Sequence, residues 1–356
     1  MMVPLQLLGL SLQEWVALAI AAFAGGAFGA ALGALPAFIF TGFMVIAGEA
    51  VNTLATDLTG EVQAEIGTGI TGFVAFGPVF GPHVSFAGGA AAAAYAARKG
   101  YMDTGFDYHE AKNIAYALGT KPDVLVVGGL FGILGMVIRQ ISGGLLSLPW
   151  DPIAMGVVLS AVFHRLVYSY PLIGSTRGGG LFDMGPFERE ERRGDAVADG
   201  GATADRLAVE PWLPHQYKWP NVAMIGAVTG ILAAYTTVQT GSIFLGFGIS
   251  AASLLFLNCG VDQIPVTHHM TLPGATAAVA YAGSVGEMAI LPSVIVGGLF
   301  GLTGAMSGEV IQRVFYSHSD THFDPPAAAI VINTFVIAVL AIVGVFPSSA
   351  WVPLPI

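Results

Sequence analysis

Long apolar runs, each close to the length of a membrane span, follow one another along most of the chain. A membrane helix needs about 20 predominantly apolar residues. In the first half these runs cover residues 13–34, 36–56, 67–97, 123–141 and 152–171. In the second half they cover residues 220–238, 240–258, 260–283, 288–310 and 325–346. The pattern predicts an all-α polytopic membrane protein with about ten transmembrane segments.

The composition supports this fold class. The chain is 54% hydrophobic and only 10% charged, whereas a soluble domain carries about 25% charged residues. Its one cysteine, Cys259, excludes an intramolecular disulfide framework. The net charge of −10 argues against nucleic acid as a partner. An acidic chain that is poor in lysine is typical of salt-adapted organisms, because salt screens the repulsion, so we expect a halophilic archaeal host.

Short motifs recur in the same order in the two halves, which indicates an internal duplication. The shared motifs are VGGLFG at 127–132 and 296–301, His-x-Ser/Thr-x-x-Gly at His83 and His269, and Asp-Pro at Asp151 and Asp324. We therefore predict a first membrane repeat at 1–172 and a second at 219–356. Between them, residues 173–218 are acidic and lack helical periodicity, and we expect a flexible cytoplasmic linker.

The orientation follows from the number of crossings and the positions of basic residues. Five crossings per repeat is an odd number, so the second repeat would enter the membrane inverted. With both termini external, ten basic residues in the loop 98–121 and the linker fall on the cytoplasmic side together with Arg313, and only Arg139 falls outside. This agrees with the positive-inside rule. An even number of crossings per repeat would also misplace Arg313 and stays an alternative.

The loop 98–121 contains signals for a short surface helix. Asp107 and Glu110 have the spacing of a capping box, and Gly119 supplies a stop. We expect a helix between them that lies on the membrane surface.

The third segment of each repeat is interrupted. Gly-Pro pairs at Gly77 and Gly81 break the first, and a polar stretch from Cys259 breaks the second. The apolar run that remains in each case is too short to span a bilayer. Broken segments at matching positions in two repeats are the best sequence indication of a transporter's binding site.

The polar residues around these breaks are the predicted substrate-binding residues. His83 and His269 begin the two half-helices, where unpaired N–H groups favour an anion, and Ser85 and Thr271 add hydroxyl groups. In the second repeat the break also contains Asp262, Gln263 and His268. The alternative is that all of these groups only satisfy backbone atoms freed by the breaks.

Two further sets of polar residues are weaker candidates. Glu49 and Asn52, in the second segment, are candidates for binding a coupling ion, although a carboxylate at a helix end is the simpler explanation. His318, Asp320 and His322 alternate along the chain and in an extended strand would face one side, as metal ligands do. The next acidic residue, Asp324, is already explained as a helix cap.

Other motifs limit the function. Glycines four residues apart, as in the repeated VGGLFG, indicate faces where helices pack within or between subunits, including in a homo-oligomer. The signatures His-Glu-x-x-His and Gly-x-Ser-x-Gly are missing from the sequence, so we expect no enzyme of those classes. The sequence identifies no cofactor.

The stretch GFVAFGPVFGPHVSFAGGAAAAAYAARKGY, together with the two GGLFG helices, resembles permease-like, uncharacterised polytopic membrane proteins of haloarchaea. The resemblance covers most of the chain and implies the architecture, without a substrate or a site.

These observations favour a multi-pass protein of the cell membrane that acts as a secondary transporter or permease. Its partners would be membrane lipids and a small solute or ion, and the helix N-termini favour a small anion or carboxylate. A non-transporting oligomeric scaffold protein and a passive channel are the alternatives.

Overall fold

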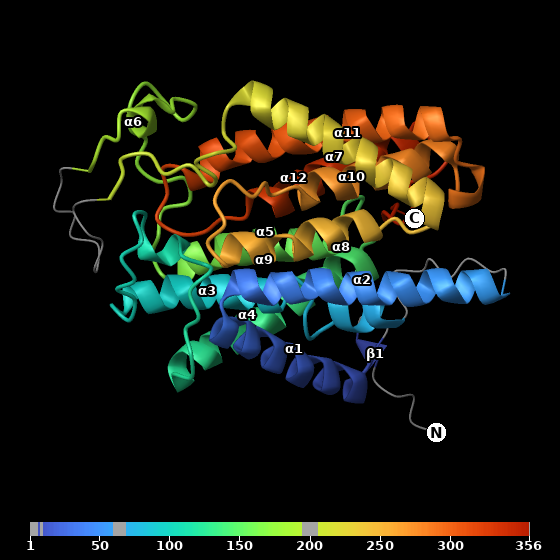
Figure 1. Ribbon diagram of the computed structural model, residues 1–356. Coiled ribbons are helices and arrows are strands. Elements are labelled where there is room, and N and C mark those ends of the chain that lie inside the picture. Colours follow the sequence, from blue (N-terminus) through green and yellow to red (C-terminus); the bar gives the residue numbers. More distant parts are fainter. Residues whose placement is uncertain (1–5, 8–9, 60–68, 194–205, 356) are drawn as a thin grey trace.

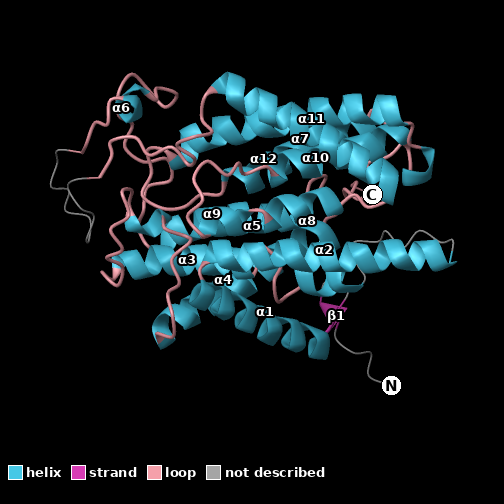
Figure 2. Ribbon diagram, in the orientation of Figure 1, coloured by secondary structure: helices cyan, strands magenta, loops and turns pink. Residues whose placement is uncertain are grey.

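The structure is a computed structural model that describes residues 6–7, 10–59, 69–193 and 206–355. Helices dominate it, and most of the long ones run side by side, while loops gather at one end with the short helix α6 (Figures 1 and 2). Near the N-terminus, the two-residue strands β1 (Gln6–Leu7) and β2 (Leu10–Ser11) pair antiparallel.

Each of the ten predicted apolar segments contains helical residues. The first half contains α1 (Leu12–Leu32), α2 (Ala34–Thr59), a π-helical turn (Thr71–Ala75), α3 (Ser85–Arg98), α4 (Pro122–Arg139) with a π-helical extension (Gln140–Leu145), and α5 (Pro152–Val167). The rest contains α6 (Gly185–Glu188), α7 (Trp219–Thr240), α8 (Leu245–Ala252), α9 (Leu254–Asn258), α10 (His268–Ala282), α11 (Ile290–Ile311) with a π-helical extension (Gln312–Tyr316), and α12 (Pro325–Ile342). Short 3-10 turns occur at Glu110–Lys112 and Val285–Glu287.

Six of these helical stretches are long and apolar enough to cross a membrane. They are Leu12–Leu32, Ala34–Ala55, Pro122–Leu145, Trp219–Thr240, Ile290–Tyr316 and Pro325–Ile342. In α1 the side chains of Leu12, Val16 and Ile20 are exposed, whereas Gly25 and Gly26 are buried. Large apolar side chains outside and small residues inside suit a helix that is surrounded by lipid. The structure therefore has the features of a helical membrane protein.

Glycine faces bring the long helices into close contact within the chain. A Cβ atom on Gly26 of α1 would overlap the carbonyl oxygen of Gly128 in α4. A Cβ atom on Gly230 of α7 would likewise overlap the carbonyl oxygen of Gly297 in α11. The glycines of both VGGLFG motifs thus pack against the first helix of their own half.

Helices α4 and α11 run in opposite directions. The loop that precedes α4 contains Lys112, and its Nζ donates a hydrogen bond to the carbonyl oxygen of Tyr316, at the end of the extended α11. This end of the molecule therefore holds the start of α4 and the end of α11. Figure 1 shows β1 away from α6, toward the other end of the molecule.

The predicted caps of the fifth helices are confirmed. The Asp151 carboxylate accepts hydrogen bonds from the backbone N–H groups of Ile153 and Ala154 at the start of α5. The Asp324 carboxylate accepts one from the N–H group of Ala327 at the start of α12.

Two local predictions are wrong. The surface helix expected in the loop 98–121 is reduced to the 3-10 turn Glu110–Lys112, because the Glu110 carboxylate accepts hydrogen bonds from the backbone N–H and hydroxyl group of Thr104 and does not cap a helix. The single segment expected at 240–258 is divided into α8 and α9. Gly241 ends α7 in a left-handed conformation (φ 72°), and α8 begins only at Leu245.

The flexibility expected for the linker 173–218 stays a prediction. Many of its described residues, including 206–211 and Leu213, are buried. Arg193 and Arg206 are joined by a backbone hydrogen bond next to the bridge between Arg192 and Leu207.

Candidate functional site

A cavity of about 1150 Å³ lies between the two halves of the protein. The segment before α3 contributes Phe76 and Pro82 to its wall, and the segment before α10 contributes Val266. Each half thus supplies its interrupted third segment to one shared space.

Aromatic side chains form much of the cavity wall. The Phe38 ring lies 5.9 Å from those of Phe86 and Phe247, measured between ring centroids, and the Phe76 ring lies 5.6 Å from that of Phe244. Such a wall favours an organic solute with an apolar part, since ligand sites of this size are mainly apolar with a few placed polar groups.

Three of the predicted substrate-binding residues line this cavity. The His268 ring is buried and lies 4.7 Å from the Phe38 ring and 5.8 Å from the Phe247 ring. Its Nδ1 atom has no hydrogen-bond partner among the described residues. Asp262 and Gln263 are more accessible members of the same wall.

The other four predicted residues lie outside the described cavity wall. Gly135 of α4 passes against the backbone of His83, and Gly304 of α11 passes against the backbone of His269. His83 and His269 are buried, and the His269 ring contacts Trp212 at 5.9 Å. The two histidines therefore occupy similar positions in separate helix interfaces.

The hydroxyl groups near these histidines bind backbone atoms at the breaks. Ser85 Oγ donates to the carbonyl oxygen of Phe80 at 3.2 Å, and Thr271 Oγ1 donates to that of His268 at 3.3 Å. The Ser85 bond satisfies a carbonyl group that a continuous helix would have paired, whereas the Thr271 bond lies within the first turn of α10. The role of these four residues in substrate binding stays a prediction.

The coupling-ion candidate Glu49 is buried and lies between the two halves. Its Oε1 atom accepts hydrogen bonds from Thr71 Oγ1 at 2.7 Å and from Asn52 Nδ2 at 3.3 Å. Its Oε2 atom accepts one from Ser242 Oγ at 2.5 Å. Polar partners from three separate segments thus surround one carboxylate.

The three weak metal candidates point to different partners. His318 Nε2 lies 3.3 Å from the carbonyl oxygen of Leu181, and His322 Nε2 lies 3.2 Å from an Asp324 oxygen. Asp320 forms ion pairs with Arg193 and Arg206. Within the part of the chain that the structure describes, no group of three or more His, Cys, Asp or Glu side chains is placed to hold a metal ion.

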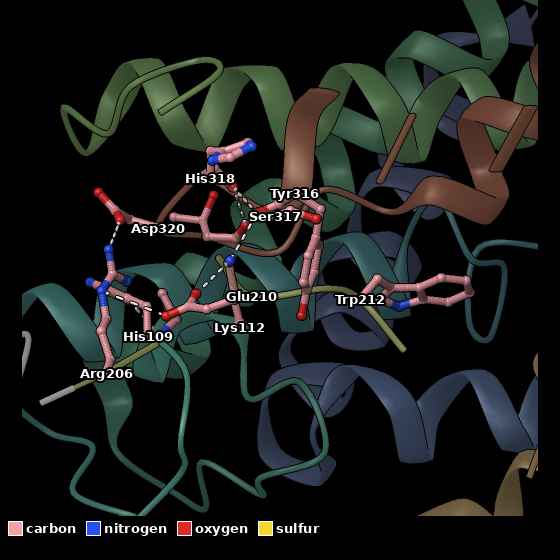
Figure 3. Close-up of polar contacts among 12 residues, drawn as sticks. His109, Lys112, Arg206, Glu210, Trp212, Tyr316, Ser317, His318 and Asp320 are labelled. Carbon is pink, nitrogen blue, oxygen red and sulfur yellow. Dashed lines mark hydrogen bonds and ion pairs between the residues drawn. The ribbon is translucent and has the colours of Figure 1, made fainter. Parts of the chain in front are cut away.

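A buried network of charges, which sequence reasoning missed, connects the linker to both halves (Figure 3). Lys112 Nζ lies 2.6 Å from Glu210 Oε2, and both side chains are fully buried. Arg206 pairs with Glu210 and also with Asp320. Lys112 and Tyr316 also line the cavity, so the network reaches the cavity wall.

The environment of this network shifts the pKa values of its members. Burial lowers the pKa of Lys112 to about 8, and the Glu210 carboxylate limits the decrease. Burial and the nearby Arg206 guanidinium lower the pKa of His109 to about 3. Burial alone would raise the pKa of Asp320, but the interaction with Arg206 outweighs it and the pKa is lowered. His109 is therefore neutral at pH 7, while Asp320 is ionised.

Comparison with known proteins places the chain in a family. A family model described as "Family of unknown function (DUF7973)" matches residues 8–355. The chain belongs to this family. None of the curated proteins matches it, and none of the solved structures does. The DUF7973 match covers both halves and the linker, so the cavity and the charge network lie within one family unit.

Proposed function

We propose that this protein is a secondary transporter whose substrate binds in the cavity between the two halves. The observation that carries the proposal is the position of the cavity, which both interrupted third segments line. Transporter sites lie at the interface between repeats, where discontinuous helices leave room and polar groups for a solute.

The proposed architecture is two inverted repeats of five membrane segments with broken third helices. Two observations support it. The opposite directions of α4 and α11 are those expected for an inverted pair. The matching contacts of Gly135 with His83 and of Gly304 with His269 are those expected for a duplication. Rocking of one repeat against the other would then expose the cavity to each side in turn.

The wall of the cavity supports an organic anion, such as a carboxylate with an apolar part, as the substrate. Arg139 lines the cavity and donates a hydrogen bond to the Gln140 side chain. It forms no ion pair with the described residues, and the undescribed segments contain acidic residues only at 60–68 and 194–205. A guanidinium group in the wall supports a carboxylate substrate, which it can bind through two parallel hydrogen bonds, and the His268 imidazole adds a further polar group.

The proposed location is the cell membrane, with the linker in the cytoplasm and both termini outside. Basic residues support this orientation, since those of the loop 98–121 and of the described linker lie toward the end of the molecule that holds α6, away from β1. The proposal includes no enzymatic step.

The test is solute exchange in proteoliposomes that contain the purified protein. Liposomes loaded with an aromatic or branched aliphatic carboxylate should take up the same labelled compound by counterflow, and Arg139→Gln should reduce the uptake at least tenfold. Gln140→Ala serves as a neighbouring control that keeps the positive charge. A passive channel would give flux without counterflow, and a scaffold protein would give none, so either result across a panel of carboxylates refutes the proposal.

A further inference from the structure

The surroundings of Glu49 combine hard oxygen ligands with an uncompensated negative charge. Two carboxylate oxygens, the Thr71 hydroxyl and the Ser242 hydroxyl meet within hydrogen-bond distance, and the Glu49 side chain is 3% exposed. The Asn52 amide lies at the edge of this group. Carboxylate and hydroxyl oxygens are the ligand types that hard cations prefer.

No positively charged side chain balances Glu49. Among the described residues, no lysine, arginine or histidine forms an ion pair with it. The segments outside the described residues contain no such side chain either, as their sequences consist of apolar, small polar and acidic residues. Burial of an ionised carboxylate without a counter-charge is unfavourable, and inside a membrane segment a carboxyl group usually has a functional role.

We propose that Glu49, Thr71 and Ser242 form a binding site for one sodium ion. Each hydroxyl now donates its proton to the carboxylate, and rotation about its C–O bond would turn an oxygen lone pair toward an ion instead. Sodium would then neutralise Glu49 and be held by oxygens from α2, from the π-helical turn after it and from the segment before α8.

The position of this site links it to the cavity. Thr71 begins the turn that ends before Phe76, and Ser242 stands two residues before Phe244. The rings of Phe76 and Phe244 contact each other and line the cavity. Sodium would therefore hold together the two segments that carry this aromatic pair. Its use as a coupling ion rests on the proposed transport function, but its binding does not.

The experiment is equilibrium binding of ²²Na⁺ to the purified protein in detergent, at constant ionic strength with choline chloride as the replacement salt. Wild type should bind about one Na⁺ per chain, and Glu49→Gln should lose this binding. Ser242→Ala and Thr71→Val, which keep the carboxylate, should weaken it at least fivefold.

Glu309→Gln is the matched control, because Glu309 is also buried in a long helix but is paired with Arg313. It should bind Na⁺ like the wild type. Thermal unfolding of the same samples should show that NaCl stabilises the wild type more than choline chloride does, and that Glu49→Gln removes the difference.

Absence of bound ²²Na⁺ in folded wild type would overturn the proposal, as would equal binding by wild type and a folded Glu49→Gln variant. A proton on Glu49 in place of sodium would give the first of these results. Because no transport is measured, failure of this site is distinct from failure of the proposed function.

Discussion

The buried pair of Lys112 and Glu210 makes the most direct test of how the linker is held. The substitution Glu210→Gln keeps the shape of the side chain but removes the charge opposite Lys112. Both side chains are fully buried and their charged atoms lie 2.6 Å apart, so the remaining ammonium group would have no carboxylate in contact. Removal of one partner of a buried ion pair costs about 3–5 kcal/mol. We expect about 3 kcal/mol here, since Lys112 keeps its hydrogen bond to the carbonyl oxygen of Tyr316.

A double-mutant cycle separates the pair from the surrounding network. Lys112→Met should also destabilise the protein, because it leaves Glu210 with only Arg206 as a counter-charge at 3.6 Å. The double variant, Lys112→Met with Glu210→Gln, should cost less than the sum of the single changes by at least about 2 kcal/mol. The free energy of unfolding can be measured by SDS titration in mixed micelles, followed by tryptophan fluorescence.

The exposed pair of Arg189 and Glu191 provides a control, since its side chains are 62% and 45% exposed. Glu191→Gln should change the free energy of unfolding by no more than about 0.5 kcal/mol. The reasoning is refuted if Glu210→Gln costs less than about 1 kcal/mol, or if the two single changes are additive.

Three other predictions follow from the structure. Below pH 6.5 the unfolded chain binds a proton at His109, but the folded protein, in which the pKa of this residue is about 3, does not. As the pH falls from 6.5 to 3, this difference should lower the free energy of unfolding by up to about 1.4 kcal/mol per pH unit. His109→Asn should reduce that slope in acid unfolding curves. Gly135→Ala should prevent stable folding, since a Cβ atom there would overlap the carbonyl oxygen of His83, whereas Gly286→Ala meets no atom within 4 Å and should leave the melting temperature unchanged. In sealed vesicles, the exposed Cys259 should react with an impermeant maleimide added on the linker side. A cysteine introduced by Leu354→Cys, in a Cys259→Ser background, should react only from the opposite side. Labelling of both cysteines from one side would contradict the proposed orientation.

The sequence alone determined the positions of the long helices, because the signals for them are local. Apolar runs mark the long helices, and Asp151 and Asp324 cap the fifth helix of each half through bonds to N–H groups two or three residues away. Glycine and proline pairs such as Gly81-Pro82 interrupt the third segment, since proline has no backbone N–H group to donate and glycine is a poor helix former.

Only the tertiary structure decided which polar groups meet. Lys112 and Glu210 are 98 positions apart in the chain, and Glu49 and Ser242 are 193 apart, so no periodicity relates them. Such contacts also explain why the helix predicted in the loop 98–121 does not form. There the Glu110 carboxylate accepts a hydrogen bond from Thr104, and Lys112 forms the buried ion pair with Glu210. A capping box is worth about 1 kcal/mol, whereas an unpaired buried charge costs several times more, and the larger cost sets the conformation of the loop.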